Sequence, residues 1–541
     1  MSASIASVPP PLNEPVRTYA QSTADRGRLE AELTRQSATV VEIPCVIGGR
    51  RVFTGTVREV RMPCDHGHVL ARLHLAGPQE VAQAVEAAEG ARADWAGLPW
   101  EARAAVLLRA AELLAGPWRE RVNAATMLGQ GKTAHQADID AACELIDFWR
   151  FNVSYYRSML AEQPPAHSPG VWNRTDLRPL DGFVFAIAPF NFTSIAANLC
   201  TAPALVGNTT LWKPSITSAL ACWVVFEMLE AAGLPPGVVN LLGGDGPDIG
   251  PLILARPELG GVHFTGSTGV FQSIWREIGG NIERYRAYPR IVGETGGKDF
   301  IVAHPSAEVD ALAVAIVRGG FEYQGQKCSA ASRVYVPRSL WPKVAGRCRE
   351  MTREMKQGDV RDFSNFLGAV IDERAFQRHR GWLERLRSES EVIVGGGSSD
   401  RTGWFVEPTL ARVDDPNHAV MTTELFGPIV GAFVYEDADW SKTLALIDRS
   451  SPYALTGSIF STDRYAVEEA LGALRHAAGN VYINDKPTGA VVGQQPFGGG
   501  RASGTNDKAG APANLARWIS PRTIKETMVP PSSWRYAFLG D

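Results

Sequence analysis

The feature that most constrains the fold is an alternation of short apolar runs with helical segments between residues 181 and 304. Runs of this length separated by helices of 10–15 residues are typical of βαβ units and a parallel sheet. The turn after each strand of such a sheet is where the phosphates and ribose of a nucleotide usually lie. The predicted strands are residues 182–188, 209–214, 238–242 and 261–266, and the predicted helices begin after residue 192 and span 219–233 and 247–255.

A second alternation follows from residue 299 to residue 485, which predicts a second α/β domain. Its clearest strand signals are 300–304, 332–337 and 479–484. Before the first alternation, residues 43–75 contain short β-like pieces separated by Gly and Pro. Pro78 then opens a helical region, because the missing N–H of a proline costs nothing in the first turn of a helix. Predicted helices there are 78–95, 100–115 and about 136–160, whereas residues 1–40 are predicted to form an arm outside the core.

The composition excludes several classes of protein. A chain of 541 residues with 45% hydrophobic and 21% charged residues is long enough for more than one core. The net charge of −4 gives no general attraction to nucleic acid or to anionic membranes. No apolar run approaches the ~20 residues that a membrane-spanning helix needs, and the N-terminus lacks the apolar core of a secretory signal. We therefore expect no nucleic-acid partner and no membrane partner.

Seven cysteines are scattered without a Cys-x-x-Cys pair. This pattern argues against a disulfide framework and against a structural zinc site, and we expect no metal. A reducing, cytoplasmic location is the expectation that follows. Most of the cysteines are predicted to be small buried hydrophobic residues, namely Cys45, Cys64, Cys143, Cys200, Cys222 and Cys348.

Cys328 differs, because its neighbours in QGQKCSAAS are polar and turn-like. Glu294 precedes it by 34 residues in VGETGGKDF, and Asn191 lies in APFNF. A thiol, a carboxylate and an amide are the groups needed to oxidise an aldehyde through a covalent thioester. A free thiol with a pKa of ~8.5 is only about 3% ionised at pH 7, so a nucleophilic Cys328 requires local positive charge. Lys327 is adjacent but is not credited, since neighbouring side chains often point apart.

Two loops are candidates for nucleotide contacts. LWKPS ends a predicted strand with Lys213, whose ammonium could bond ribose hydroxyls. FTGSTG places Gly266 and Ser267 where a helix could begin, with its N-terminal amides facing a phosphate. Spacing alone favours a solvated lysine and an ordinary N-cap serine. The glycine run 243–250 misses the Gly-x-Gly-x-x-Gly spacing and is more often a plain turn.

Seven motifs occur in an order that resembles the aldehyde dehydrogenase superfamily: PFNF, LWKPS, FTGS, ETGGK, GQKCSA, ELFGP and PFGGGRASG. They span about residues 45–525, so the resemblance covers nearly the whole chain. The chain is most similar to the Δ1-pyrroline-5-carboxylate dehydrogenase branch, also called L-glutamate γ-semialdehyde dehydrogenases, in its monofunctional form. The segments that carry this finer resemblance are GQGKT (129–133), ELIDFWRFN (144–152), FEYQGQKCSA (321–330) and VGQQPFGGGRASGTNDKAG (492–510).

The resemblance implies that the chain is an enzyme that oxidises L-glutamate γ-semialdehyde to L-glutamate with NAD, the second step of proline catabolism. Cys328 would attack the aldehyde, and the side-chain amide of Asn191 with the Cys328 backbone N–H would hold the oxyanion. Glu294 would activate the water that hydrolyses the thioester.

The resemblance also implies the residues that bind NAD. Lys213 would bond the adenosine ribose, with Pro214 and Ser215 in the same turn. Gly266 and Ser267 would lie at the pyrophosphate. Glu424 and Phe426 of ELFGP would hold the nicotinamide ribose. Some family members carry an acid three positions after that lysine; this chain has Ile216 there, so the choice between NAD and NADP stays open, and NAD follows from the habit of the branch.

For the substrate, the resemblance implies an aliphatic chain packed between Phe192 and Phe497, Ser329 near a carboxylate, and Glu144 at the edge of the pocket. Members of the branch hold the α-carboxylate with a Gly-Ser pair. This sequence has Gly489 followed by Ala490, which removes one hydroxyl donor. Another small acidic semialdehyde therefore remains an alternative substrate, and a non-catalytic binding protein on the same fold is the alternative from a different class.

The implied architecture is an α/β fold of the aldehyde dehydrogenase type, and a homodimer or higher homo-oligomer is expected. The run WNRTDLR within 166–180 alternates weakly and predicts an exposed β-hairpin that needs a partner edge. The expected domains are an N-terminal arm (1–40), a Rossmann-like NAD-binding domain (41–165 and 181–293), an α/β catalytic domain (294–500) and a small β oligomerisation flap (166–180 and 501–541).

Overall fold

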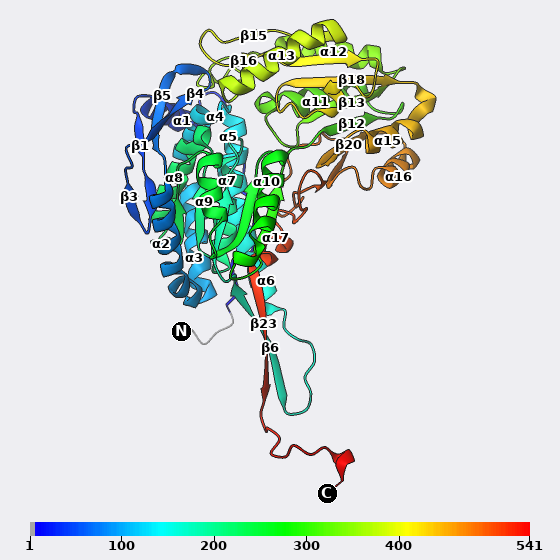
Figure 1. Cartoon of the computed structure of the whole chain (residues 1–541). Coiled ribbons are helices and arrows are strands. Elements are labelled where there is room, and N and C mark those ends of the chain that lie inside the picture. Colours follow the sequence, from blue (N-terminus) through cyan, green and yellow to red (C-terminus); the bar gives the residue numbers. More distant parts are fainter. Residues whose placement is uncertain (1–5, 541) are drawn as a thin grey trace.

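The computed structural model describes residues 6–540 and contains two seven-stranded sheets that form two lobes (Figure 1). The first five residues of the predicted arm and residue 541 of the predicted flap lie outside the described residues. Among the described residues, no helix combines the length and apolar character needed to cross a bilayer.

The first sheet has the strand order β11-β10-β7-β8-β9-β2-β3, and its first five strands are parallel. The chain runs from β7 through β8 to β9 and then returns to the other side of β7 as β10, so the strand order reverses between β7 and β10. Ligands of open α/β sheets bind at such a reversal, beyond the carboxyl ends of the strands. The strands are β2 (Cys45–Ile47), β3 (Arg50–Val52), β7 (Phe183–Ile187), β8 (Thr210–Lys213), β9 (Val239–Leu241), β10 (Leu259–Thr265) and β11 (Arg290–Glu294).

Helices cover both faces of this sheet, and each face has its own core. One face packs against α2 (Pro78–Gly97), α9 (Gly246–Leu254) and α10 (Thr268–Gly280). The other packs against α7 (Thr193–Leu205) and α8 (Ala219–Ala231), with a further layer of α3 (Trp100–Ala115), α4 (Arg119–Gln130) and α6 (Leu145–Ala161). The predicted alternation between residues 181 and 304 is therefore confirmed strand by strand and helix by helix, and Pro78 occupies the first turn of α2.

The second sheet has the order β14-β17-β18-β13-β12-β20-β21 and is parallel except for β14 at one edge. Helices α11 (Val309–Phe321) and α12 (Trp341–Glu354) cover one face, and α13 (Glu373–Glu389), α15 (Trp440–Arg449) and α16 (Arg464–Ala473) cover the other. The second predicted alternation thus forms a second, mostly parallel sheet with helices on both faces. Its strands are β12 (Asp299–Ala303), β13 (Ala331–Pro337), β14 (Glu391–Val394), β17 (Thr409–Val413), β18 (Ile429–Tyr435), β20 (Thr456–Phe460) and β21 (Asn480–Ile483).

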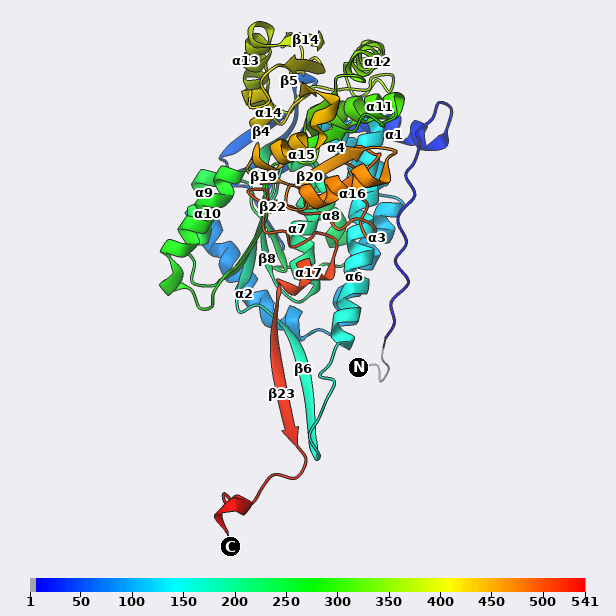
Figure 2. The same ribbon diagram turned by 90° about the vertical axis from the view of Figure 1, so that its right-hand side faces the viewer.

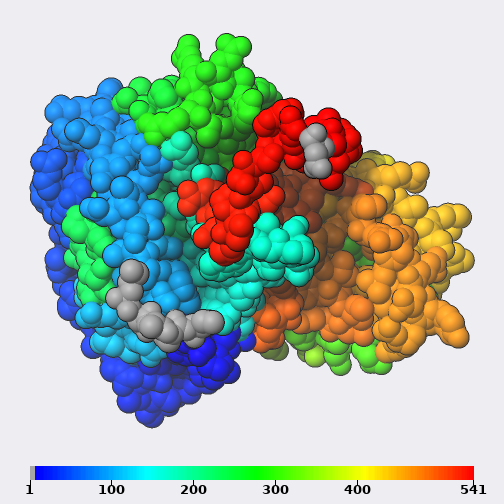
Figure 3. Space-filling model, turned by 90° about the horizontal axis from the view of Figure 1, so that it is seen from below, coloured from blue at the N-terminus to red at the C-terminus, as the bar shows by residue number. Residues whose placement is uncertain are grey.

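A two-stranded ribbon projects from the first lobe (Figure 2). It consists of β6 (Val171–Pro179) and β23 (Ile519–Thr527), paired antiparallel along their whole length. The predicted hairpin within 166–180 is therefore wrong, because the partner of β6 comes from the far C-terminal part of the chain. Seen along the ribbon, the C-terminal segment (red) lies beside the β6 region (cyan) and in front of the junction between the lobes (Figure 3).

Residues 501–518 were predicted to belong to the flap, but they lie against the lobes and not in the ribbon. Gly504 forms an isolated β-bridge with Glu294, and Ala509 forms one with Phe497. Leu515 belongs to the core between the first sheet and helices α7 and α8. We therefore restrict the proposed flap to the ribbon and the residues that follow it. In 528–540 several apolar side chains are exposed, including Trp534, Tyr536 and Phe538.

The N-terminal segment contributes to the core, so the prediction of an arm outside the core is wrong for part of it. Helix α1 (Ala24–Ser37) packs against α4 through the buried residues Leu29 and Leu33. Tyr19 is also buried, and its hydroxyl donates a hydrogen bond to Asp138. Apolar residues spaced four apart bury one face of the helix, and that spacing is visible in the sequence.

The helix predicted at about 136–160 is not a uniform α-helix. The short helix α5 (Ala134–Ala137) leads into a π-helical segment, Asp138–Glu144, before α6 begins. A π-helical turn re-aims side chains relative to an α-helix and often occurs at functional sites. Here the segment ends at Glu144, one of the predicted pocket residues.

Candidate active site

The carboxyl edge of the first sheet collects most of the predicted site residues. Asn191 follows β7, Lys213 ends β8, Ser267 follows β10 and Glu294 ends β11. Parallel strands bring these positions to one edge although they lie far apart in the sequence. The edge includes both strands that flank the reversal of strand order.

Cys328 comes to this edge from the second lobe, on the loop before β13. Its Sγ lies 3.7 Å from Glu294 Oε1, to which the thiol donates a hydrogen bond. Burial raises the pKa of Glu294 to about 8, while the hydrogen bond from Cys328 and the charge of Lys508 oppose that rise. Burial, followed by the charge of Glu294, raises the pKa of the Cys328 thiol well above its ordinary value. A reactive thiolate at this position therefore needs added positive charge or transfer of its proton to Glu294.

The loop that carries Cys328 has an unusual backbone. Tyr323, Gln324 and Gly325 are consecutive residues with positive φ angles of 52°, 54° and 63°. A Cβ on Gly325 would lie 2.2 Å from the carbonyl oxygen of Gly427, so only glycine fits there. Positive φ is costly for residues other than glycine and occurs mainly where surrounding structure enforces it, often at functional sites. Lys327 pairs with Glu322 at 3.0 Å, which supports leaving it out of the thiol chemistry.

Asn191 reaches the same loop from the turn between β7 and α7. Its Nδ2 donates to the carbonyl oxygen of Gln326 over 3.0 Å, two residues before the cysteine. The side chain is buried, with 4% of its surface exposed. One N–H of the amide is used in this bond, and the other can donate to an oxyanion. The three predicted catalytic residues thus share one site, contributed by both lobes.

The predicted cofactor residues around β8 and β10 form a donor-rich surface. Lys213 Nζ donates to the carbonyl oxygen of Pro214 at 3.2 Å, and burial lowers its pKa to about 8. Ser215 Oγ lies 3.2 Å from Thr217 Oγ1 in the next turn. Ser267 is the N-cap of α10 and accepts from the Val270 N–H, while the Gly266 N–H bonds the Glu294 carbonyl at 3.1 Å. The expectation that Gly266 and Ser267 open a helix is confirmed.

Glu424 is held by backbone amides on both oxygens. Its Oε2 accepts from the Gly297 N–H at 3.0 Å, and its Oε1 accepts from the Phe426 N–H at 2.9 Å. Phe426 has a φ of 54° and stands edge-on to Phe190 at 5.6 Å between ring centroids. Burial raises the pKa of Glu424, and the nearby charge of Lys298 opposes that rise. The two bonds fix the Glu424 carboxylate in place, and each oxygen keeps a lone pair that can accept a further hydrogen bond.

The predicted substrate residues fall into two groups. Glu144 and Phe497 line, together with Glu294, a cavity of ≈ 40 Å³, which is large enough for water molecules. Ser329 Oγ donates to Thr488 Oγ1 at 2.8 Å, so the serine beside Cys328 is connected to the loop that contains Gly489 and Ala490. Gly489 has a φ of 97°, where a side chain would be strained.

Phe192 lies at the N-terminus of α7, directly after Asn191. Sequence reasoning missed the group behind its ring. Lys132 Nζ sits 4.1 Å from the centroid of the Phe192 ring and 2.6 Å from Asp140. Lys132 belongs to GQGKT, a motif noted in the sequence as a family resemblance, but nothing in its pattern indicated contact with the site. In the described part of the chain, no cluster of three or more His, Cys, Asp or Glu side chains is arranged to hold a metal ion.

The site and the fold define the class of protein. Residues 53–524 match the model of the aldehyde dehydrogenase family, and the chain belongs to that family. It is 50% identical over 540 residues to the mitochondrial Δ1-pyrroline-5-carboxylate dehydrogenase of Dictyostelium discoideum, covering 99% of this chain and 97% of that protein. It is 46% identical over 530 residues to the human mitochondrial enzyme of the same name, covering 97% and 94% of the two chains.

Comparison with solved structures indicates the same family. The crystal structure of the Δ-pyrroline-5-carboxylate dehydrogenase from Mycobacterium tuberculosis bound with NAD superposes with a TM-score of 0.96 at 53% identity, covering 100% of both chains. A 1-pyrroline-5-carboxylate dehydrogenase from Thermus with bound NAD superposes with a TM-score of 0.90 at 31% identity, covering 96% of this chain and 100% of that chain. The predicted family and fold class are confirmed.

Proposed function

We propose that this protein is an NAD-dependent dehydrogenase that oxidises L-glutamate γ-semialdehyde, in equilibrium with Δ1-pyrroline-5-carboxylate, to L-glutamate. This is the second step of proline catabolism. The observation that carries the proposal is the 3.7 Å approach of Cys328 Sγ to Glu294 Oε1, on a loop that also bonds the amide of Asn191. Full-length similarity to enzymes of this activity supports the choice of substrate.

The first chemical step is attack of the Cys328 sulfur on the aldehyde carbon. Glu294 already accepts the thiol hydrogen bond, and a carboxylate with a pKa near 8 is basic enough to take that proton as the C–S bond forms. The second N–H of the Asn191 amide and the Cys328 backbone N–H stabilise the oxyanion; losing one such donor typically costs ~3 kcal/mol of barrier. The product of this step is a thiohemiacetal on Cys328.

When bound, NAD supplies the hydride acceptor that converts the thiohemiacetal on Cys328 into a thioester. Glu294 releases to solvent the proton that it took from Cys328 and then removes a proton from water; hydroxide adds to the thioester carbonyl, and the Cys328 thiolate leaves. The cavity beside Glu294 offers space for that water.

The side chains at the edge of the first sheet fit a dinucleotide. The Lys213 ammonium has more N–H donors than its bond to Pro214 uses, which suits a ribose hydroxyl. The N-terminus of α10, opened by Gly266 and Ser267, presents backbone amides suited to the pyrophosphate. Glu424, with Phe426 beside it, has lone pairs available for the hydroxyls of the second ribose. Pro214 and Ser215 shape the turn around the first ribose.

For the substrate, we propose that Phe192 and Phe497 pack against the aliphatic chain and that Glu144 borders the pocket. Ser329 and the loop with Gly489 and Ala490 would face the α-carboxylate, with backbone N–H groups in place of the absent serine hydroxyl. Burial raises the pKa of Glu144 to about 8, with Asp140 adding to the shift, so this side chain is largely protonated at neutral pH and does not repel a carboxylate.

The experiment is to mix the protein with NAD and the semialdehyde and to follow the absorbance of reduced cofactor. Activity that a Cys328→Ala variant lacks supports the proposal. Full activity in that variant contradicts the mechanism, and inactivity of the unaltered protein with every acidic semialdehyde tested favours the alternative of a non-catalytic binding protein. Repeating the assay with NADP measures the preference between the two cofactors, because Ile216 stands where some family members carry an acid.

Three further expectations belong to this proposal. The ribbon of β6 and β23 would pair with a second copy to form a homodimer. The domain division stays a prediction, with the cofactor domain before Glu294 and the catalytic domain after it. A cytoplasmic location also stays a prediction, because the names of the Dictyostelium and human relatives place those proteins in mitochondria.

A further inference from the structure

A buried lysine stands directly behind the active site. Lys132 has 1% of its side chain exposed, and its Nζ lies 2.6 Å from Asp140 Oδ2, whose side chain is fully buried. The same ammonium sits 4.1 Å from the centroid of the Phe192 ring and 4.5 Å from that of Tyr323. Phe192 follows Asn191, and Tyr323 belongs to the strained loop that leads to Cys328. The charge is thus placed between the two segments that carry the catalytic groups.

Asp140 connects this pair to helix α7. Its Oδ2 accepts from the Thr193 N–H at 3.0 Å, and its Oδ1 accepts from the Ser194 N–H at 3.0 Å and from Ser194 Oγ at 2.7 Å. The N-cap of α7, Phe192, offers no side-chain cap of its own. A carboxylate at the N-terminus of a helix satisfies free N–H groups and interacts favourably with the helix dipole. Asp140 therefore fixes the first turn of α7.

The residues next to Lys132 also form hydrogen bonds with both segments, the start of α7 and the loop before Cys328. Gln130 Nε2 donates to Thr193 Oγ1 at 2.7 Å, on α7. The carbonyl oxygen of Gly131 accepts from Gln324 Nε2 at 2.9 Å, on the loop before Cys328. Residues 130–132 thus contact the support of Asn191 on one side and the support of Cys328 on the other.

We infer that Lys132 and Asp140 are positioning residues that set the placement of the Asn191 amide and the Phe192 ring relative to Cys328. A buried ion pair is a poor source of stability, since desolvation offsets most of the attraction, whereas breaking one partner is strongly unfavourable. A geometric role accounts for the pair: misplacement of a reacting group by about 1 Å can reduce a rate by about a hundredfold. The inference rests on the proposed function only for the assay with the semialdehyde.

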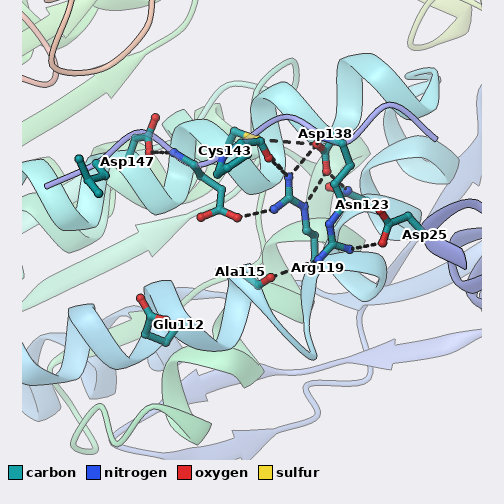
Figure 4. A network of polar contacts seen from close by, with 12 residues as sticks. Asp25, Glu112, Ala115, Arg119, Asn123, Asp138, Cys143 and Asp147 are labelled. Carbon is teal, nitrogen blue, oxygen red and sulfur yellow. Dashed lines mark hydrogen bonds and ion pairs between the residues drawn. The ribbon is translucent and has the colours of Figure 1, made fainter. Parts of the chain in front are cut away.

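The chain contains a matched control pair. Arg119 and Asp138 are equally buried, approach to 2.8 Å, and involve the same π-helical segment (Figure 4). This pair contacts the N-terminal segment and not α7. Arg119 forms an ion pair with Glu14 at 2.6 Å, and Asp138 accepts a hydrogen bond from the Tyr19 hydroxyl. Loss of Arg119 therefore removes a buried charge of the same kind without touching the catalytic segments.

The test compares Lys132→Met, Asp140→Asn and Arg119→Met, with the melting temperature recorded for each. Hydrolysis of 4-nitrophenyl acetate reports on Cys328 and its oxyanion site without NAD or semialdehyde, and Cys328→Ala gives the background rate. We expect Lys132→Met and Asp140→Asn to lower the Cys328-dependent rate by about tenfold or more. In the NAD assay, kcat should fall by a similar factor, with KM for NAD within about twofold of the unaltered value. Arg119→Met should lower the melting temperature and keep the ester rate within about twofold.

A fourth variant covers the case in which a single change prevents folding. The double variant Lys132→Met with Asp140→Asn leaves no unpaired buried charge, so it should fold, and its ester rate should still be low. Ester and semialdehyde rates within about twofold of the unaltered protein in that variant would overturn the inference. Equal behaviour of Lys132→Met and Arg119→Met would do the same. If the unaltered protein fails to oxidise the semialdehyde, the proposed function is wrong, while the ester comparison still decides the role of the pair.

Discussion

The Ser329 hydroxyl donates a hydrogen bond to Thr488 Oγ1 at 2.8 Å, and this bond joins the residue after Cys328 to the loop that ends in Gly489 and Ala490. The loop is further held by Lys486, whose Nζ donates to the Thr488 carbonyl oxygen at 3.2 Å. The residue after Cys328 and the loop proposed to face the substrate carboxylate are therefore connected through this side-chain contact. The position after Gly489 is the place where a hydroxyl would add a donor to this loop.

We predict that Ala490→Ser lowers KM for L-glutamate γ-semialdehyde. A hydrogen bond to a charged group contributes ~1.5–3 kcal/mol, so the decrease should be about tenfold to a hundredfold if the new hydroxyl bonds the carboxylate directly. The measurement is initial rate against semialdehyde concentration at saturating NAD. Ala490→Val, which adds bulk without a donor, is the control and should not lower KM. An unchanged or higher KM for the serine variant would mean that backbone N–H groups already bind the carboxylate fully.

We predict that Glu294→Gln separates the two halves of the reaction. The amide cannot take the proton of the Cys328 thiol, so thioester formation should be slower than in the unaltered protein. It cannot take a proton from water either, so the thioester that forms should accumulate, and reduced cofactor should appear in a slow burst of at most about one equivalent. Rapid mixing with NAD and semialdehyde, followed by mass measurement of the protein, checks both points. Cys348→Ala is the control, because this buried cysteine lies on α12, outside the proposed site. Steady turnover by Glu294→Gln at the unaltered rate would assign the base to another group.

Much of the fold could be predicted because each of its signals is local. The strands around Lys213 and His263 are short apolar runs bounded by turns, and a parallel sheet then brings their ends together without further information. The contact of Cys328 with Glu294 could be predicted only through the family resemblance, since the two residues come from different lobes. Spacing alone did not distinguish Lys213 from a solvated lysine.

The parts that could not be predicted depend on distant pairing. The partner of β6 lies more than 300 residues away, so WNRTDLR gave a strand but not its neighbour. Burial of Tyr19 depends on Asp138, which the sequence does not connect to it. The position of Lys132 between two aromatic rings has no periodic pattern either, because each ring belongs to a separate segment.

We predict that Tyr19→Phe lowers the free energy of unfolding by about 1–2 kcal/mol, because it removes buried hydrogen bonds of the hydroxyl. That hydroxyl donates to Asp138 at 2.9 Å and accepts from Asn123 at 2.9 Å. Urea unfolding measured at the same pH for both proteins gives the difference, and kcat with the semialdehyde should stay within about twofold. Tyr465→Phe, at an exposed position, is the control and should leave the unfolding curve in place. Equal stability of Tyr19→Phe would mean that the N-terminal segment adds no net stability through this hydroxyl.

We predict that Ile524→Pro converts the proposed dimer to a monomer. Ile524 pairs with Arg174 in the middle of the ribbon, and proline removes a backbone donor and disfavours a strand interior. Ile524 belongs to none of the hydrophobic cores, although Ile519 at the start of β23 does, so the rest of each subunit should stay folded. Light scattering of the eluting protein should show the mass of one chain for this variant and of two chains for the unaltered protein and for Ile524→Val. A dimer that persists in Ile524→Pro would place the interface elsewhere.

We predict that thioester hydrolysis rises with pH through about 8, following the ionisation of Glu294. Only the ionised carboxylate can accept a proton from water, so the rate is low below this pKa and reaches a plateau above it. Decay of the acetyl-enzyme formed from 4-nitrophenyl acetate, measured from pH 6 to 10, isolates this step. Glu144, His263, Asp507 and Lys508 line the same cavity as Glu294.

We expect the charge of Lys508 to set the pH at which the rate of thioester hydrolysis rises. Its ammonium donates to two carbonyl oxygens and to Asn480 Oδ1, all neutral acceptors, and its charge lowers the pKa of Glu294. Lys508→Met should therefore move the inflection upward by about half a unit to one unit, whereas Lys508→Arg should leave it in place.

Stability should show the opposite trend with pH. The pKa of Glu294 in the folded protein, about 8, exceeds its ordinary value of 4.5, so the stability present below pH 4.5 is lost as pH rises toward and through 8. Glu294→Gln should remove this part of the pH dependence of the free energy of unfolding. If the acetyl-enzyme decays at a rate independent of pH between 6 and 10, Glu294 is not the group that activates the water.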